Sequence, residues 1–483
     1  MRKTKIICTL GPSTDKGDVL RELIANGMNV ARFNFSHGSY EEHGGRLANL
    51  KALREELGKP VAALLDTKGP EIRLKEFKNG VEMLEAGQTF TLTTREVEGT
   101  KEICSVTYKD LPHDVHEGGT IMLDDGLIML RIEKVTDTDI TCTVLNSGKI
   151  KTKKGVNVPG VHLSMPYLSQ KDREDIIFGI QNGFDFIAAS FVRTAQDVYD
   201  IRNLLNEYDS NIRIIAKIEN REGVNNIDSI LSAADAVMVA RGDLGVEIPA
   251  EQIPVAQRLL VSKCIESKKP VIIATQMLHT MITHPRPTRA EISDVANAIY
   301  QRVDAVMLSG ETANGQYPVE AVKTMARVAR EIEKDTAQNS PNYDMNLVRI
   351  NNEITAQLSR SAVRACINLP IRAIIIDTLS GRTGRYLAAF RGEKPVYAVC
   401  YRKSVMRQLG ISYGIHAMYR EPTINHESFL LGVLYYLEDR KWLCKEDMIV
   451  VIGGSFGAAK GASFLEIGNV LNLEHKALNA QNL

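Results

Sequence analysis

Short apolar runs that end in polar residues recur along the first two-thirds of the chain. Each run is rich in Val, Ile, Ala and Leu, and most are followed by a pattern typical of an amphipathic helix. Continuous apolar runs of this kind are typical of parallel strands covered on both faces. The eight runs are TKIICTLGP (4–12), NVARFNFSHG (29–38), VAALLDTKGPEIR (61–73), FDFIAASFVR (184–193), IRIIAKIENREG (212–223), AVMVARGDLG (236–245), VIIATQML (271–278) and DAVMLSGET (304–312).

Eight such strands, most of them followed by a helix, predict a (β/α)8 TIM barrel. In that fold the carboxyl ends of the strands meet at one mouth, and active sites lie there. We therefore expect the polar residues that end the runs to gather at this mouth.

The alternation of strand and helix breaks after the third run. From about residue 72 to residue 166 there is no long helical pattern, and alternating polar and apolar residues predict antiparallel strands and hairpins. The clearest stretches are QTFTLTT (88–94), GTIMLDDGLIMLRIEKV (119–135) and DITCTVLNSG (139–148). Asp124-Asp125-Gly126 is typical of a hairpin turn. We expect an all-β domain inserted after strand three, beside the barrel mouth, in the position of a lid.

A second α/β series follows the barrel. The polar stretch KDTAQNSPNYDMN (334–346) predicts a linker. After it, helical patterns, the longest near 426–443, alternate with the apolar runs RAIIIDT, PVYAVCY and MIVVIGG, which predicts a small doubly wound α/β domain. The predicted division is a barrel in two parts, a lid and a C-terminal α/β domain, with the ranges 1–70 and 167–338, 71–166, and 339–483.

Composition narrows the class of protein. Lys plus Arg and Asp plus Glu both number 59, so the formal net charge is zero, which argues against nucleic-acid binding as the main function. The seven Cys are scattered without a CxxC pair, which favours reduced thiols over a structural zinc site. The first residues lead into a strand without a signal-peptide pattern, and no apolar run approaches the roughly 18 residues of a membrane helix. We expect a cytoplasmic protein with no membrane and no nucleic-acid partner.

Two acidic residues end neighbouring strands of the predicted barrel. Strand residues two apart share a face, so Lys217 and Glu219 lie on one side of strand five, and strand six ends at Arg241-Gly242-Asp243. Neighbouring strands lie about 4.8 Å apart, so both acids can reach one cation, and carboxylates without His or Cys favour Mg²⁺ or Mn²⁺. A Lys-x-Glu pair can equally be a salt bridge, and ARGD a helix-capping turn. Together at a barrel mouth, however, they favour a metal site.

Further polar residues surround this predicted metal site. Positive groups that converge on Mg²⁺ suit a phosphorylated anion, because phosphoryl transfer needs charge neutralisation. The four cations are Arg32, Arg73, Lys154 and Lys217. A second group of oxygen-bearing residues could hold a monovalent cation or simply pair with backbone; it comprises Asn34, Ser36, Asp66 and Thr67. Backbone N–H groups at Gly242 and Gly245 could bind a carboxylate, although glycine is also common in such turns.

Long motifs across the chain resemble those of the pyruvate kinase family, in its order and with its spacing. They are TKIICTLGPST, NVARFNFSHGS, LLDTKGPEIR, KGVNVPG, AKIEN, ARGDLGVE, ATQML, PRPTRAE and MLSGETANGQYP. The resemblance implies a barrel, an inserted β lid and a C-terminal regulatory domain. It also implies a glycolytic enzyme, a homotetramer, that transfers the phosphoryl group of phosphoenolpyruvate to ADP.

The resemblance also implies roles for individual residues. It assigns catalysis to Lys217, Thr275 and Arg32, and the substrate to the same three residues with Gly242 and Asp243. It assigns Mg²⁺ (or Mn²⁺) to Glu219 and Asp243, and K⁺ to Asn34, Ser36, Asp66 and Thr67. It assigns the nucleotide to Asn34, His37, Arg73 and Lys154. Glu71 resembles the acidic residue of the K⁺-dependent branch of the family, in which a Lys at this position would supply the missing charge, so we expect K⁺ activation.

The C-terminal domain carries TLSGRTGR (378–385) directly after a predicted strand. In the family this loop resembles the site of a sugar-phosphate or nucleotide effector, although a capped helix start would look similar. The implied effector residues are Thr378, Ser380, Gly381, Arg382 and Thr383. A second loop, Gly453-Gly454-Ser455-Phe456-Gly457, departs from the family pattern at Phe456, so the effector is not identified.

Two other classes of protein remain open from the residues. Other barrels, including pyruvate-type aldolases, use paired carboxylates, Mg²⁺ and an Arg to make or cleave enolates, but they need neither the lid nor Lys154. A non-catalytic scaffold or RNA-binding protein on the same fold is disfavoured by the intact polar set and the neutral charge.

Overall fold

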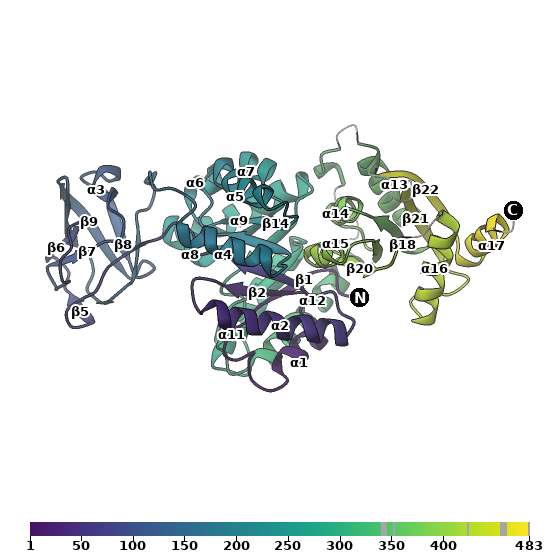
Figure 1. Cartoon of the computed structure of the whole chain (residues 1–483), viewed down its shortest axis with the longest axis horizontal. Helices are drawn as coiled ribbons and strands as arrows, with labels where there is room; N and C mark the ends of the chain where they lie inside the picture. The colour runs from purple at the N-terminus through teal and green to yellow at the C-terminus, as the bar shows by residue number, and fades with distance from the viewer. Residues whose placement is uncertain (340–344, 351–352, 423–424, 455–460, 482–483) are drawn as a thin grey trace.

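The computed structural model describes residues 1–339, 345–350, 353–422, 425–454 and 461–481, and it forms three domains in a row (Figure 1). The barrel lies in the middle, the β lid at one end and the C-terminal α/β domain at the other. The predicted fold class is therefore confirmed.

Eight parallel strands close the barrel in the order β1-β17-β16-β15-β14-β13-β3-β2. They are β1 (Lys5–Thr9), β2 (Val30–Asn34), β3 (Ala62–Asp66), β13 (Phe186–Ala189), β14 (Arg213–Ile218), β15 (Ala236–Ala240), β16 (Val271–Ala274) and β17 (Ala305–Leu308). Each lies within one of the eight apolar runs. The helices around them are α1 (Val19–Asn26), α2 (Tyr40–Glu56), α4 (Gln170–Gln181), α5 (Ala195–Glu207), α6 (Arg221–Asn225), α7 (Ile227–Ala233), α8 (Arg241–Glu247), α9 (Ile253–Glu266), α10 (Arg289–Tyr300), α11 (Gly310–Ala313) and α12 (Pro318–Asn339).

The strands are apolar on both faces because each face has its own layer to fill. Alternate residues such as Val30, Leu64 and Ile215 pack inside the barrel, whereas the residues between them pack against the helices. Ile411 of the C-terminal domain joins the interior cluster, and Gly410 beside it approaches Asn29 and Pro60, which precede β2 and β3. The amino-terminal end of the barrel is thus closed by the C-terminal domain, and the carboxyl-terminal mouth is left for the site.

The lid is built of antiparallel strands with one parallel pair. Its main sheet has the order β4-β12-β8-β9-β10-β6-β7, and β11 pairs with β5. The strands are β4 (Ile72–Arg73), β5 (Val81–Leu84), β6 (Thr89–Thr93), β7 (Ile103–Ser105), β8 (Thr120–Leu123), β9 (Ile128–Val135), β10 (Asp139–Val144), β11 (Gly148–Lys151) and β12 (Gly155–Asn157), with one short helix, α3 (Leu111–Asp114). The predicted turn Asp124-Asp125-Gly126 joins β8 to β9, and all three residues have positive φ.

The lid and the C-terminal domain attach to the barrel differently. The lid has a hydrophobic core of its own, which includes Phe90, Leu130 and Ile140. The C-terminal sheet shares one cluster with the barrel, since Ile376 and Leu387 belong to the same core as the barrel's outer face. The lid is therefore a separate packing unit, whereas the C-terminal domain is continuous with the barrel.

The C-terminal sheet has the order β20-β19-β18-β21-β22, with β22 antiparallel at the edge. Its elements are α13 (Ile354–Asn368), β18 (Ile371–Thr378), α14 (Arg382–Ala389), β19 (Val396–Cys400), α15 (Lys403–Gln408), β20 (Ile415–Tyr419), α16 (His426–Asp439), β21 (Met448–Gly454), β22 (Ala462–Asn469) and α17 (Val470–Gln481). Helices α16 and α17 pack on the face that carries Ile375 and Val451. The edge strand β22 had no counterpart among the predicted strands.

The predicted linker 334–346 is wrong in its first part, because α12 continues to Asn339. Buried side chains hold this last part of the helix in place. The carboxylate of Glu333 accepts hydrogen bonds from the backbone N–H groups of Lys3 and Thr4, and Thr336 is buried as well. Residues 340–344 of the predicted linker lie outside the described part of the chain.

Two buried ion pairs join the barrel to the C-terminal domain. Asp304, just before β17, is 2.5 Å from Arg391, and both side chains are 1% exposed. Asp185, just before β13, is 2.8 Å from Arg407 of α15. Both acids stand at the amino-terminal ends of barrel strands, so the C-terminal domain is fixed to the end opposite the mouth.

Within the described ranges, we find no helix with the length and apolar character needed to span a membrane.

Candidate active site

A polar layer follows the apolar interior of the barrel at its mouth. Because strand residues alternate, the faces that carry Val30, Leu64 and Ile215 inside the barrel next present Arg32, Asp66 and Lys217. Ser190 continues the face of Ala188 just beyond β13 in the same way. Four neighbouring strands, β2, β3, β13 and β14, thus bring their polar ends together.

Lys217 is the centre of this layer. Its ammonium lies 3.0 Å from Asp66 Oδ1, 3.0 Å from Glu219 Oε1 and 2.7 Å from Ser190 Oγ. The Ser190 hydroxyl donates in turn to the Thr67 carbonyl at 2.7 Å. The Lys217 side chain is 10% exposed and its ammonium is held from several sides, so its position is fixed before any ligand arrives.

Arg32 completes the layer from β2. Its Nε donates to Asp66 Oδ2 at 2.5 Å, and its Nη1 donates to the hydroxyl of Thr9 at 3.0 Å. Burial opposes ionisation of Asp66, but the charges of Arg32 and Lys217 outweigh it and lower the pKa of this carboxyl. Asp66 therefore remains an anion between two cations.

The electrostatics of Lys217 and Glu219 follow from the same burial. Burial alone would lower the pKa of Lys217, but Asp66 and Glu219 reverse the effect and raise the pKa, so the group stays an ammonium. Burial raises the pKa of Glu219 to about 7, and Asp243 and Asp66 add to the rise against the opposing charge of Lys217. Glu219 is therefore a desolvated carboxyl whose ion pair with Lys217 only partly offsets the effect of its burial.

The predicted acid pair does stand on neighbouring strands. Glu219 follows β14 and Asp243 follows β15, and their carboxylates are close enough for the charge of Asp243 to act on Glu219. The backbone N–H of Phe191 donates to Glu219 Oε2 at 2.6 Å and orients it. In the described part of the chain, no group of three or more His, Cys, Asp or Glu side chains is arranged so that it could hold a metal ion. A divalent ion bound by the carboxylates of Glu219 and Asp243 would keep positions for substrate oxygens and water.

The oxygen atoms predicted for a monovalent ion come from adjacent strands. Asn34 of β2 stands opposite Asp66 of β3 in the register. Asn34 Oδ1 accepts from the backbone N–H of Ser36 at 3.2 Å, and the hydroxyl of Thr67 donates to the carbonyl of Ala188 at 3.3 Å. One carboxylate with neutral oxygens is a donor set that suits K⁺, and this ion remains a prediction.

A cavity of about 530 Å³ separates the lid from the barrel mouth. Its lining includes Asp243 and three of the four residues predicted to bind nucleotide, namely His37, Arg73 and Lys154; Asn34 is not part of the lining. Lys154 is 2.7 Å from Asp124 of the hairpin turn, and Arg73 is 2.7 Å from Glu71. The lid thus contributes both cations to the cavity.

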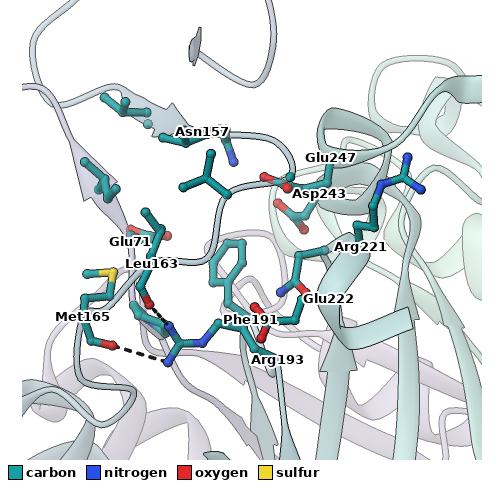
Figure 2. A pocket seen from close by; sticks show the side chains of 18 of the residues that line it. Glu71, Asn157, Leu163, Met165, Phe191, Arg193, Arg221, Glu222, Asp243 and Glu247 are labelled. Atoms are coloured by element: carbon teal, nitrogen blue, oxygen red, sulfur yellow. Dashed lines mark hydrogen bonds between the residues drawn. The ribbon is translucent and has the colours of Figure 1, made fainter. Parts of the chain in front are cut away.

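The far side of the cavity carries residues that sequence reasoning missed (Figure 2). Arg193 donates to the carbonyl oxygens of Leu163 at 2.8 Å and Met165 at 3.4 Å, which ties the segment returning from the lid to the end of β13. Asp125 of the lid has its pKa raised by burial and by the charge of Asp243, so the hairpin turn approaches α8. Arg193, like Ser190, stands where one of the apolar runs turns polar. A polar residue at the end of an apolar run was therefore a usable signal for both residues, but the sequence prediction used it only for other runs.

Thr275 and Gly242 meet at the ends of β16 and β15. The backbone N–H of Gly242 donates to the Thr275 hydroxyl at 2.8 Å. Thr275 itself has a φ of 67°, in the left-handed region that β-branched residues avoid. The predicted substrate residues Lys217, Asp243, Gly242 and Thr275 therefore come from three successive strands of the barrel.

The predicted effector loop lies at the carboxyl end of β18. The Thr378 hydroxyl accepts from the backbone N–H of Gly381 at 2.9 Å, and Gly381 has a φ of 78°, which suits glycine. Arg382 begins α14, with Ser380 before it and Thr383 after it. Residues 455–457 of the second predicted loop lie outside the described part of the chain.

A lidded barrel whose mouth holds two acids, a fixed ammonium and further cations suits an enzyme that transfers a phosphoryl group. Family models agree: "Pyruvate kinase, barrel domain" matches residues 1–322 and "Pyruvate kinase, alpha/beta domain" matches residues 356–467. The chain belongs to the pyruvate kinase family. It is a glycolytic transferase, and the motif resemblance is confirmed.

Individual relatives support the same assignment. The pyruvate kinase of Geobacillus stearothermophilus is 50% identical over 457 residues, which is 94% of this chain and 78% of that protein. The pyruvate kinase of Clostridium acetobutylicum is 44% identical over 460 residues, with 94% and 96% covered. A crystal structure of a pyruvate kinase from Cryptosporidium parvum superposes with a TM-score of 0.91 at 38% identity, with 97% and 96% covered. The aldolase and scaffold alternatives find no support in these relatives.

Proposed function

We propose that this enzyme transfers the phosphoryl group of phosphoenolpyruvate to ADP, that the reaction requires Mg²⁺ or Mn²⁺, and that K⁺ activates it. The observation that carries the proposal is the position of Lys217. Its ammonium is buried between Asp66 and Glu219 at the mouth, below a cavity lined by Arg73 and Lys154. A permanent positive charge fixed beside a carboxylate pair suits a transferring phosphoryl group.

The substrate is held, in this proposal, by groups around Lys217. Arg32 binds the phosphate, while Gly242, Asp243 and Thr275 hold the carboxylate. Arg73 and Lys154 bind the nucleotide phosphates, with His37 and Asn34 beside them. A divalent ion bound by Glu219 and Asp243 would supply charge neutralisation for the phosphoryl oxygens. Asn34, Ser36, Asp66 and Thr67 would hold K⁺.

Lys217 then acts in the chemical step. The bond between phosphorus and the enol oxygen breaks, and a new bond forms between phosphorus and a terminal phosphate oxygen of ADP. The ammonium of Lys217 balances charge on the phosphoryl group and on the enolate oxygen as that charge develops. The enolate is then protonated at carbon, and Thr275 lies on the side from which that proton arrives through water, since a hydroxyl of ordinary acidity is a poor acid by itself.

A coupled assay of pyruvate formation tests this proposal. We expect pyruvate only when ADP and phosphoenolpyruvate are both present, with loss of activity on chelation of divalent ions and on replacement of K⁺ by Na⁺. Pyruvate formation without ADP would instead indicate an aldolase or a hydrolase. Full activity in excess chelator would refute the divalent-ion requirement.

Allosteric regulation by a sugar phosphate or a nucleotide is also proposed for the C-terminal domain. The loop 378–383 leaves β18 at the point where the strand order reverses, because β19 and β21 lie on opposite sides of β18. Ligands of open α/β sheets bind at such a point. A panel of sugar phosphates and nucleotides should contain an effector whose action is lost in Arg382→Ala. An identical response in that variant would refute the site.

The proposed partner is three further copies of the chain, in a homotetramer. Exposed apolar side chains on both the barrel and the C-terminal domain are available for contacts between copies of the chain. On the barrel helices α9 and α10, Val255 is 70% and Tyr300 48% exposed; on β22 and α17, Ile467 is 38% and Leu471 41% exposed. Light scattering on the protein as it elutes from a size-exclusion column should give four times the chain mass, and the mass of one chain would refute the homotetramer.

The seven free thiols support a location in the cytoplasm.

A further inference from the structure

The backbone at Thr275 is strained. Strand β16 ends at Ala274, and the next two residues, Thr275 and Gln276, have φ values of 67° and 53°. A β-branched residue in the left-handed region is an outlier that persists only where its surroundings hold it. Thr275 is one of the predicted substrate residues, so whatever holds its backbone also sets the position of its hydroxyl.

The side chain of Arg241 donates hydrogen bonds to this strained backbone. Arg241 begins α8, at the end of the neighbouring strand β15, and its guanidinium reaches across to β16. Its Nη2 donates to the Thr275 carbonyl at 2.7 Å, and its Nε donates to the Ala274 carbonyl at 3.4 Å. A planar group with several fixed donors can serve two successive carbonyls at once, which the single ammonium of a lysine cannot do in the same geometry.

Asp294 anchors the guanidinium from the other side. Arg241 Nη1 donates to Asp294 Oδ1 of α10 at 2.7 Å, and the Arg241 side chain is only 10% exposed. Its Nη2 also lies 2.9 Å from the sulfur of Met277. The guanidinium contacts are all made to protein groups, namely the Asp294 carboxylate, the Ala274 and Thr275 carbonyls and the Met277 thioether.

The hydroxyl of Thr275 completes the connection. It accepts from the Gly242 N–H at 2.8 Å and donates to the Ala274 carbonyl at 2.7 Å, the same carbonyl that Arg241 reaches. A Cβ at Gly242 would stand 3.4 Å from this hydroxyl oxygen, so the two residues are in direct contact. The orientation of Thr275 is therefore coupled to Gly242, the residue before Asp243, which is proposed to bind the divalent ion.

We propose that Arg241, anchored by Asp294, is a positioning residue that fixes Thr275 and Gly242 for the carboxylate of the substrate. The inference rests on the role proposed above for Thr275 and deepens it. Without the guanidinium, Thr275 relaxes toward an unstrained backbone, its hydroxyl turns away from Gly242, and the two residues lose the relative positions in which they are proposed to meet the carboxylate. Arg241 acts on phosphoenolpyruvate and not on ADP, whose proposed ligands Arg73 and Lys154 lie in the lid.

The test is steady-state kinetics of the full-length enzyme carrying Arg241→Lys. We expect the KM for phosphoenolpyruvate to rise between about tenfold and 100-fold, with a fall in kcat and little change in the KM for ADP. Asp294→Asn keeps a hydrogen-bond acceptor and should shift the same KM less than Asp294→Ala does. Because Asp294 is 38% exposed, these variants also test the inference if Arg241→Lys fails to fold.

The matched control is Arg202→Lys. Arg202 makes the same kind of contacts at the opposite end of the barrel, to Asp235 at 2.6 Å and to the Ala233 carbonyl at 3.3 Å, just before β15. This variant should lose thermal stability with both KM values unchanged. A purely structural role for Arg241 would give the same result in Arg241→Lys and would overturn the inference.

A double-mutant cycle separates this inference from the proposal on which it rests. If Arg241 acts through Thr275, Arg241→Lys adds little further change in the phosphoenolpyruvate KM once Thr275→Ala is present. Unchanged kinetics in Arg241→Lys beside an impaired Thr275→Ala would overturn the inference alone. Unchanged kinetics in Thr275→Ala would overturn the role of Thr275 and the inference with it.

Discussion

The ammonium of Lys217 lies 3.0 Å from a carboxylate oxygen of Asp66, and the Asp66 side chain is only 1% exposed. Asp66 ends β3 and Lys217 stands near the end of β14, so the contact spans the strand β13 between them. Asp66 thereby holds the charge of Lys217 at the mouth, and Arg32 balances the excess negative charge on Asp66.

Lys217→Met should lower kcat by about 10²- to 10³-fold, the usual cost of removing one transition-state donor, with little change in the KM for phosphoenolpyruvate. Arg32 still balances Asp66 in this variant, so folding should be preserved. Lys171→Met is the control, because Lys171 also pairs with a buried acid, Asp175 at 2.9 Å, outside the site. More than about a tenth of the normal turnover in Lys217→Met would contradict a transition-state role worth several kcal/mol.

K⁺ activation should depend on the charge at Glu71. This carboxylate is 2.7 Å from Arg73 and 3.7 Å from Lys68, at the point where the chain enters the lid. We expect low activity in buffers that contain only Na⁺, and we expect Glu71→Lys to reduce the requirement for K⁺ because it adds a fixed positive charge. Glu71→Gln removes the negative charge without adding a positive one and should still require K⁺. Equal dependence in all three proteins would count against the proposed role.

Breaking the buried pair between the barrel and the C-terminal domain should be costly. Arg391→Ala leaves Asp304 buried without its ion-pair partner, and such losses cost about 3–5 kcal/mol of unfolding free energy. The exposed pair Arg21–Glu56, with side chains 36% and 55% exposed, is the control. Arg21→Ala should cost less than about 1 kcal/mol. Urea unfolding measures both, and similar losses in the two variants would show that the buried pair is not special.

The buried acid Asp377 should make stability depend on pH. Burial raises the pKa of Asp377 to about 6, from the ordinary value of 3.8 for an aspartate, against the opposing hydrogen bond from the Gly454 backbone. A raised pKa in the folded state means that the folded form holds a proton that the unfolded form has lost. The contribution to stability is therefore full below about pH 3.8 and is lost as the pH rises through about 6.

Thermal unfolding of Asp377→Asn at several pH values checks this sign. The variant should be more stable than the parent at pH values above the folded pKa and should differ least in acid, because an amide cannot ionise. The exposed Asp439, whose side chain is 82% exposed, provides the control variant Asp439→Asn. A constant difference between Asp377→Asn and the parent at every pH would rule out ionisation of Asp377 as the cause.

Much of the fold was predictable because burial leaves a regular trace in a sequence. The eight apolar runs correspond to the eight barrel strands, and Asp124-Asp125-Gly126 is the turn that its residues indicated. The end of α12 was missed because a polar stretch can still form a helix when some of its polar side chains are buried. Glu333 and Thr336 are such buried side chains. The edge strand β22 was missed because one-sided burial gives it no continuous apolar run.

The site residues also divide into those that the sequence predicted and those that it did not. Alternation along a strand was enough to put Lys217 and Glu219 on one face and to place Asp243 on the neighbouring strand. It was not enough to find Ser190, which matters only because β13 lies between β3 and β14 in the closed barrel. Nor did it reveal the left-handed backbone of Thr275, since nothing in a Thr-Gln pair indicates positive φ.

By itself the sequence determined the order of elements, the faces on which strand residues lie and the family, since all three depend on local spacing and residue type. Only the tertiary structure decided which charges face one another, because contacts such as Lys217 to Asp66 and Arg241 to Thr275 join residues that are distant in the chain and lie on different strands of the barrel. Burial then sets the strength of those contacts. The low-dielectric interior makes each pair matter far more than its residue types alone would indicate.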